Sequence, residues 1–167
     1  EECGLSASEA RQRGCVFDAV IMGWVPWRCY DAGLARDFLA EKDWPFYRGP
    51  GWKAMDNTSD ASDSGLRMPL EEVLRGEWST LYVEEEFYLF QCTYTWRKTW
   101  QAAMSGGMLD GYVGDSHHTS HCEMLITKGP HLDKNVYMKY ASCPWVRSAD
   151  RGRFGWYRVI DGNKVYR

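Results

Sequence analysis

The order of hydrophobic and polar positions predicts helices over most of the chain and strands near its C-terminus. Residues 4–127 carry several segments with helical spacing, capping residues and stop signals. From residue 136 onward hydrophobic side chains alternate with others, which is the period of a strand. We therefore predict an α+β fold. Helices fill the N-terminal two-thirds and carry the site, and a small antiparallel sheet or hairpin forms the C-terminus.

Five segments combine a helical pattern with N-terminal caps, acidic first turns or closing glycines. They are residues 4–14, 31–40, 69–75, 80–104 and 116–127. The helix over 80–104 is the strongest of these. Glutamates at 84–86 favour its positive end, and Gly106 and Gly107 stop it.

The remaining segments are predicted to be irregular or extended. Residues 16–29 are apolar, but Gly23 and Pro26 interrupt them, which favours an extended or irregular course over the core. Residues 44–47 form an aromatic turn. Residues 48–66 are rich in Gly, Asp and Ser, so we expect a surface loop there.

Strand patterns are confined to the last third of the chain. Residues 136–145 and 154–160 alternate in the manner of strands. Asp161-Gly162 is a typical hairpin turn and would lead the chain back into residues 164–166.

One line of polar residues runs along the predicted 80–104 helix. At intervals of four, three and four residues stand Glu84, Tyr88, Gln91 and Thr95. Such spacing places them on one face of a helix. A solvated helix edge is one interpretation. The other is that this stripe faces a site that histidines also line.

Three of the chain's four histidines lie in the segment His-His-Thr-Ser-His-Cys at 117–122. In a helix, His118 and His121 are three residues apart and share a face. Two imidazoles so placed can chelate zinc or copper, and the adjoining Cys122 thiolate would be a further ligand. The alternative is an ordinary helix start, capped at residue 115 or 116, whose histidines bind nothing.

The composition excludes several classes of function. The net charge is −3, so no basic field argues for a nucleic-acid partner. Neither a G-x-S-x-G nor a nucleotide-binding glycine motif is present, which argues against a serine hydrolase and against a nucleotide cofactor. Aromatic residues make up 15% of the chain, enough for a ring-rich core or for a pocket that takes a flat or greasy ligand.

Six cysteines without a C-x-x-C pair favour disulfides in an oxidising compartment over a zinc ribbon. Cys3 and Cys15 flank the first predicted helix and could bond to each other or to partners elsewhere. The sequon Asn57-Thr58-Ser59 fits a secretory lumen. No hydrophobic run is long enough to span a membrane. Because the sequence begins at Glu1 without Met, we expect a mature or trimmed form whose signal or anchor has been removed.

Several blocks of sequence resemble a group of fungal lumenal proteins. They are Cys3-Gly4, Gly14-Cys15-Val16-Phe17-Asp18, Cys29-Tyr30-Asp31, Gln91-Cys92-Thr93-Tyr94-Thr95-Trp96-Arg97-Lys98 and His118-Thr119-Ser120-His121-Cys122-Glu123. Over about residues 3–127 the chain is similar to the UstYa-like family, named for the oxidative cyclase of ustiloxin biosynthesis. The resemblance implies a type II membrane protein of the secretory pathway, in which residues 1–167 form a single lumenal domain.

The family carries two H-x-x-H-C motifs, one on each of two helices, which are thought to build a copper site for oxidative cyclisation and related reactions. The second motif is intact here as His118, His121 and Cys122. In the first, Tyr88 and Gln91 stand at the histidine positions. Neutral Gln is a poor ligand and Tyr binds mainly as phenolate, so the predicted site is short of ligands.

Two arrangements are open for these residues. In one, His118, His121 and Cys122 hold a metal ion that a further ligand completes, with His117, His131, Asp115 and Glu84 as the candidates. In the other, the two motif cysteines are paired as Cys92–Cys122. This bond would tie the two helices together and leave neither sulfur as a ligand.

The first functional hypothesis is a metal-independent cyclase, such as a pericyclic catalyst, in fungal secondary-metabolite biosynthesis. An aromatic pocket would fold a polyketide- or peptide-derived intermediate for ring closure without a cofactor. Tyr88 and Gln91 would donate hydrogen bonds to a carbonyl, and His118 or His121 would move a proton. Glu84, on the same stripe, completes the predicted catalytic group.

Two other hypotheses remain beside this one. The second is a copper-dependent oxidase or oxidative cyclase, and the third is a non-catalytic protein that binds a catalytic partner. Under each enzymatic hypothesis the partner is a small-molecule biosynthetic intermediate and not a nucleic acid. A membrane anchor outside this sequence and a homodimer are both left open.

Overall fold

The computed structural model describes residues 2–49, 66–129, 135–146 and 155–166. Within them, helices and strands are interspersed along the chain, and the strands form two sheets. The predicted helical N-terminal two-thirds is therefore wrong. Strands β1 (Cys15–Asp18) and β2 (Gly23–Pro26) form where the sequence predicts an irregular course, because their aromatic and β-branched side chains pack within the core.

The first sheet has the order β1-β2-β7-β8-β9. β1 and β2 form an antiparallel hairpin, and β2 pairs in parallel with β7 (Lys139–Ala141). β8 (Trp156–Ile160) and β9 (Asn163–Tyr166) complete it as an antiparallel hairpin. The predicted C-terminal hairpin is confirmed. The predicted separate C-terminal sheet is wrong, because this hairpin extends a sheet that the N-terminal strands begin.

The second sheet has the order β4-β3-β5-β6. Its members are β3 (Phe46–Tyr47), β4 (Arg67–Met68), β5 (Thr80–Val83) and β6 (Asn135–Tyr137). β5 lies where the sequence predicts the first turn of the long helix. Leu81 and Val83 are buried and alternate with less buried residues, so this stretch follows the strand period.

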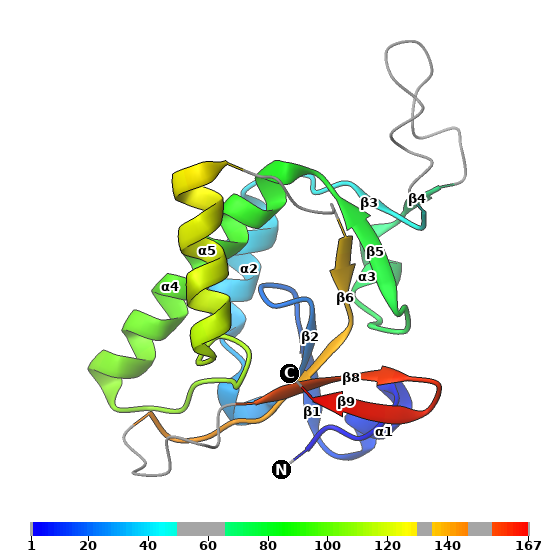
Figure 1. Cartoon of the computed structure of the whole chain (residues 1–167). Coiled ribbons are helices and arrows are strands. Elements are labelled where there is room, and N and C mark those ends of the chain that lie inside the picture. The colour runs from blue at the N-terminus through cyan, green and yellow to red at the C-terminus, as the bar shows by residue number, and fades with distance from the viewer. Residues whose placement is uncertain (1, 50–65, 130–134, 147–154, 167) are drawn as a thin grey trace.

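One extended segment, interrupted at a single residue, connects the two sheets. β6 and β7 are separated by Met138 alone, and the backbone N–H of Met138 donates to the carbonyl of Ser79 at 2.9 Å. One extended segment thus pairs with β5 on one side of the break and with β2 and β8 on the other. Figure 1 shows β6 leading from the β5 edge toward the C-terminal hairpin.

Six helical segments accompany the sheets in the described residues. They are α1 (Ala7–Gln12), the 3-10 turn η1 (Trp27–Cys29), α2 (Ala32–Ala40), α3 (Leu70–Val73), α4 (Glu85–Ser105) and α5 (Ser116–Lys128). Side chains cap three of them as the sequence predicts: Ser6 accepts from the backbone N–H of Glu9, Asp31 from that of Leu34 and Asp115 from that of His117. α4 ends at Gly106, whose φ of 65° is the left-handed conformation that glycine adopts readily.

Helix α4 packs between α2 and α5. Figure 1 shows the three helices on one side of the molecule and strands β5 and β6 on the other. Aromatic rings fill the core beside α2 and α4, where the Phe38 ring stacks on Trp44 and meets Phe87 edge-on, with centroid distances of 5.5 Å in both pairs. Part of the high aromatic content is therefore core packing.

Three disulfides account for all six cysteines: Cys3–Cys15, Cys29–Cys143 and Cys92–Cys122. Cys3 and Cys15 bond across α1, which resolves the pairing that the sequence leaves open. Three bonds of this kind are compatible with an oxidising compartment. No helix in the described ranges is long and apolar enough to cross a membrane.

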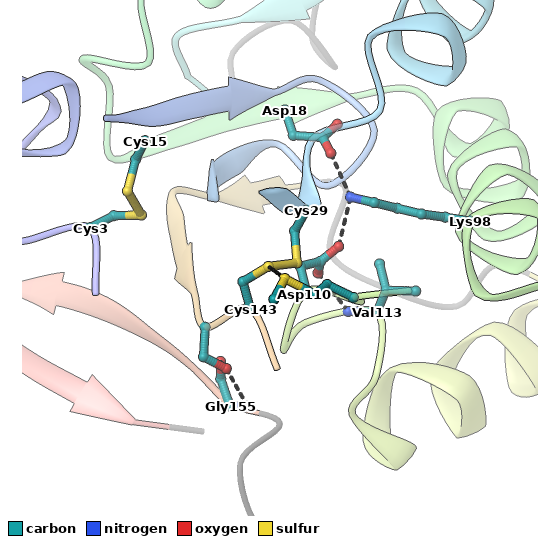
Figure 2. The surroundings of a disulfide bond; sticks show 11 residues. Cys3, Cys15, Asp18, Cys29, Lys98, Asp110, Val113, Cys143 and Gly155 are labelled. Carbon is teal, nitrogen blue, oxygen red and sulfur yellow. Dashed lines mark hydrogen bonds and ion pairs between the residues drawn. A yellow bond between two sulfur atoms is a disulfide. The ribbon is translucent and has the colours of Figure 1, made fainter. Parts of the chain in front are cut away.

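A buried ion cluster lies beside the Cys29–Cys143 bond (Figure 2). The ammonium of Lys98, on α4, is 2.7 Å from a carboxylate oxygen of Asp18 and 2.7 Å from one of Asp110. All three side chains are almost fully buried. Burial by itself lowers the pKa of Lys98, but the two carboxylates outweigh it and hold that pKa above its usual range. Burial raises the pKa of Asp18 against the attraction of Lys98.

Three regions named in the sequence predictions lie outside the described residues. They are most of the 48–66 loop with its sequon at 57–59, the stretch that holds His131, and the start of the segment predicted as a strand over 154–160. The predictions made for them stay predictions.

Candidate functional site

A cavity of about 380 Å³ brings together most of the residues that the sequence singles out. Tyr88 and Gln91 reach it from α4, and His117, His118 and His121 reach it from α5. The polar stripe therefore faces the histidine helix. The solvated-edge interpretation is wrong for Tyr88 and Gln91, which are both buried.

The opposite wall comes from the segment that joins the two sheets. Asn135 and Tyr137 of β6 and Lys139 of β7 line it, together with Tyr112 from the loop before α5 and Trp156 of β8. The indole N–H of Trp156 donates to a carboxylate oxygen of Asp115 at 3.3 Å, which links the start of α5 to the first sheet. Residues of α4, α5 and both sheets therefore line the cavity.

Glu84 does not line this cavity. It precedes the first turn of α4, and its carboxylate lies 3.5 Å from the ammonium of Lys42 at a half-exposed position. The stripe breaks here because the helix starts at Glu85 and not at residue 80. The structure therefore separates Glu84 from the other predicted site residues.

Tyr88 and Gln91 already use polar hydrogens in backbone contacts. The Tyr88 hydroxyl donates to the carbonyl of Asn135 at 2.5 Å, and the Gln91 amide donates to the carbonyl of Val20 at 2.8 Å. These bonds hold α4 against β6 and against the β1–β2 turn. Gln91 keeps one amide hydrogen that could bond to a substrate. The hydroxyl proton of Tyr88 is already used, so Tyr88 could donate to a substrate carbonyl only after its bond to Asn135 breaks.

A hydrogen bond between Nε2 of His118 and the hydroxyl of Thr95 fixes the orientation of the His118 ring. Nε2 lies 3.1 Å from the Thr95 hydroxyl oxygen, and that hydroxyl donates its proton to the carbonyl of Cys92 at 2.9 Å. Thr95 Oγ1 must therefore accept from His118, which places the ring proton on Nε2. Nδ1 is then an unprotonated acceptor.

Nδ1 of His118 has no hydrogen-bond partner within the described part of the chain and is shielded from solvent. Burial, followed by the nearby Lys139, lowers the pKa of His118 to about 4, while Asp110 and Asp115 oppose the shift. The ring is therefore neutral at physiological pH. An orphaned buried acceptor costs about 1–3 kcal/mol. A ligand donor placed at this nitrogen would recover that cost.

We expect the fold to lose stability as the pH falls from about 7 toward 4. The folded pKa of His118 lies near 4 and the unfolded one near 6.5, so between them the unfolded chain binds a proton that the folded chain does not. The contribution to the unfolding free energy is roughly 2–3 kcal/mol.

Urea unfolding at several pH values measures this loss. In the His118→Gln variant the decline should be shallower by that amount. The matched control is His117→Gln, because His117 is exposed on the same turn of α5. Identical pH slopes for His118→Gln and the unaltered chain would contradict the assignment.

His121 lies half-buried one turn along α5. Its ring centroid is 6.4 Å from that of Tyr88. Burial, followed by Lys139, also lowers the pKa of His121. Since it is less enclosed than His118, His121 is suited to exchange protons between the cavity and solvent.

The described residues do not fit a copper site. No group of three or more His, Cys, Asp or Glu side chains in the described ranges is arranged to hold a metal ion. Cys122 is bonded to Cys92, so it supplies no thiolate, and the conditional ligand set is reduced to His118 and His121. His118 Nε2 is already engaged with Thr95. Structural and catalytic metal centres usually have three or four protein ligands.

Lys139 is the functional candidate that the sequence predictions miss. It is a buried lysine in the cavity wall, 5% exposed, and its ammonium lies 4.8 Å from the centre of the Tyr112 ring. Burial, followed by repulsion from Arg158, lowers the pKa of Lys139 to about 7. The local sequence gives no signal of its burial, because the hydrophobic positions Val136, Met138 and Tyr140 alternate with Lys139 and fall on the opposite face of a strand.

Gly23 makes the position of Lys139 possible. A Cβ added at Gly23 would lie 2.7 Å from the carbonyl oxygen of Lys139, closer than side-chain carbons approach. Because β2 has no side chain at this point, β7 can pair with it directly. The glycine that seems to interrupt residues 16–29 is therefore what brings the C-terminal lysine to the site.

Comparison with known proteins gives two relatives. The chain is similar to the phomopsin biosynthesis cluster proteins B and B′ of Diaporthe leptostromiformis, at 26% identity to each over 140 residues. The match takes in 75% of this chain and 36% of each relative, so the chain spans about a third of the length of these relatives. No family model and no solved structure matches.

Proposed function

We propose that this chain is a fungal secondary-metabolite enzyme that closes a ring in a peptide- or polyketide-derived intermediate by metal-independent proton transfer. The observation that carries the proposal is His118 in the wall of an aromatic cavity, with a ring whose buried Nδ1 has no hydrogen-bond partner among the described residues. The likeness to proteins of a phomopsin biosynthesis cluster and to the UstYa-like family supports the natural-product context.

His118 acts as the base in this proposal. Its ring proton sits on Nε2, held toward Thr95, so Nδ1 is the atom that accepts a proton from the substrate once a small rotation of the ring exposes this shielded nitrogen to the cavity. The lowered pKa keeps the ring unprotonated and available. His121, which is less buried, returns the proton to the product or to solvent.

The cavity positions the substrate for ring closure. The rings of Tyr112 and Trp156 meet edge-on with a centroid distance of 5.4 Å, and Tyr112 lies 4.3 Å from the His118 ring. These ring faces would hold the intermediate in a folded conformation with its reacting ends close together. This lowers the entropic part of the activation barrier to ring closure. Tyr88 and Gln91 act mainly by fixing the wall, through their bonds to Asn135 and Val20.

Deletion of the gene in the producing fungus tests the proposal by the composition of the metabolite that accumulates. A redox-neutral ring closure predicts an open-chain isomer with the elemental formula of the product. An oxidative closure predicts a precursor with two more hydrogen atoms. An unchanged metabolite profile would overturn the enzymatic proposal and favour a protein without catalytic function.

Complementation of the deletion assigns the role of His118. We expect His118→Gln to lower product formation by about a hundredfold to ten-thousandfold, the usual contribution of a general base. Ser120→Ala is the matched control, because Ser120 is exposed on α5 and lies outside the cavity wall. Full activity of a folded His118→Gln variant would contradict the proposed base.

The copper-dependent alternative is tested separately by elemental analysis of the purified, active chain. Near-stoichiometric copper that is lost in His121→Ala, together with activity that depends on it, would replace the metal-independent mechanism. Activity that survives chelation in a metal-poor preparation would support the proposal.

A further inference from the structure

The chain contains two buried lysines of opposite character. Lys98 is held between the carboxylates of Asp18 and Asp110, both at 2.7 Å. Lys139 is as deeply buried, yet among the described residues its ammonium donates only to two backbone carbonyls, of Ile21 at 3.1 Å and Tyr137 at 3.0 Å. Within the described ranges, no carboxylate is among the groups that shift the pKa of Lys139. A buried cation without a counter-charge is costly to maintain.

Positive and basic groups surround Lys139 from several elements. Repulsion from Arg158 of β8 lowers the pKa of Lys139. Repulsion from Lys139 in turn lowers the pKa of His118 and of His121 on α5. Tyr112 presents its ring face to the ammonium. Among the described residues of the cavity wall, Asp115 is the one acidic side chain, and both of its oxygens accept hydrogen bonds, from the His117 backbone and the Trp156 indole.

We propose that the cavity binds a carboxylate of its substrate on Lys139, so that the substrate supplies the counter-charge that the protein omits. An ammonium has three donors, and two of those of Lys139 are taken by carbonyls. The third is left for a charge-assisted bond, the strong kind of hydrogen bond. This inference rests on the proposed function, because it names the substrate class of the same cavity.

The rest of the wall suits the remainder of such a substrate. The Tyr112 ring lies over the ammonium, and Tyr137 and Trp156 line the same cavity. A carboxylate on Lys139 would thus anchor an otherwise apolar or aromatic intermediate beside His118. The charged end fixes its orientation, and the rings accept its body.

Benzoate and benzamide form a matched pair of probes, since they share a ring and differ in charge. We expect benzoate to bind at least tenfold more tightly than benzamide near pH 6.5, measured by calorimetry. Lys139→Met should abolish this preference. Lys128→Met, which removes an exposed lysine at the end of α5, should keep it. Equal binding of the two probes, or a preference that survives Lys139→Met, would overturn the inference.

A second measurement uses the unaltered chain and does not depend on a variant that folds. Benzoate should raise the pKa of Lys139, observed by NMR of isotopically labelled lysine. By linkage, its affinity should weaken about a hundredfold between pH 6 and pH 9, as the free amine with a pKa of about 7 loses its proton. An unshifted Lys139 resonance at saturating benzoate contradicts the assignment.

The two proposals fail in different ways. Benzoate binding requires no turnover, so an anion site confirmed in a chain whose deletion leaves metabolites unchanged would overturn the enzyme and keep the site. Conversely, loss of ring closure in His118→Gln with no carboxylate preference in the unaltered chain would keep the enzyme and overturn the site.

Discussion

Replacement of Lys98 by Met should lower the unfolding free energy by about 3–5 kcal/mol, because it leaves Asp18 and Asp110 buried without their shared cation. Met matches the length of the lysine stem, so the loss arises from charge and not from a cavity. Urea unfolding at about pH 7.5 measures it. Arg97→Met is the control on the same helix, and its half-exposed pair with Asp37 should be worth less than about 1 kcal/mol.

The pH dependence of the Lys98→Met variant separates charge from packing. Without the cation, burial raises the pKa of the Asp18 carboxyl further above its unfolded value, so the folded variant gains stability where this group is protonated. The deficit relative to the unaltered chain should therefore shrink as the pH falls toward about 5. A triple variant that adds Asp18→Asn and Asp110→Asn should recover most of the loss. A deficit that is constant with pH would show that the cluster acts through packing alone.

Removal of the Cys29–Cys143 disulfide should have a similarly large effect. The bond closes a sequence separation of 114 residues, for which loop entropy predicts about 4–5 kcal/mol of stabilisation. The double variant Cys29→Ala/Cys143→Ala should lose that amount. Cys3→Ala/Cys15→Ala, which opens a separation of only 12 residues, should lose about 3 kcal/mol.

A site readout accompanies the stability measurement. Cys143 comes two residues after the end of β7, and Cys29 lies in the 3-10 turn that follows β2. The bond therefore holds together the two strands whose pairing places Lys139. We expect the Cys29→Ala/Cys143→Ala variant to weaken benzoate binding even where it is fully folded. The Cys3→Ala/Cys15→Ala variant should leave that affinity unchanged. Equal losses in the two double variants would refute the distinction between the bonds.

Local signals in the sequence predict α2, α5, the greater part of α4 and the C-terminal hairpin. Asp31 and Asp115 cap their helices as expected, and the turn at Asp161-Gly162 has positive φ at both residues. The same local signals place Tyr88 with Gln91 on one helix face and His118 with His121 on another, because three-residue spacing fixes a helix face. The packing of α4 against α5 then brings the two pairs to one cavity.

The parts that escape prediction depend on contacts distant in sequence. Residues 80–83 form β5 because β3 and β6 lie beside them, and neither neighbour is visible from the local pattern. Gly23 looks like an interruption until β7 is seen against it. Lys139 likewise becomes a buried amine only when α5, β2 and β8 surround it, so its local pattern predicts an ordinary strand residue.

The parallel pairing of β2 with β7 also bears on the order in which the molecule folds. Gly23 and Lys139, neighbours in that ladder, come from opposite ends of the chain, whereas α4 and α5 are consecutive and joined by Cys92–Cys122. Contacts between segments distant in sequence form slowly, because the entropy of closing a long loop is lost before the contact stabilises the chain. The side of the cavity formed by α4 and α5 can therefore assemble early, and the side formed by β7, which carries Lys139, assembles late. A newly made chain would then acquire the proposed base before the proposed anion site, and would bind ligand only after β2 and β7 have paired.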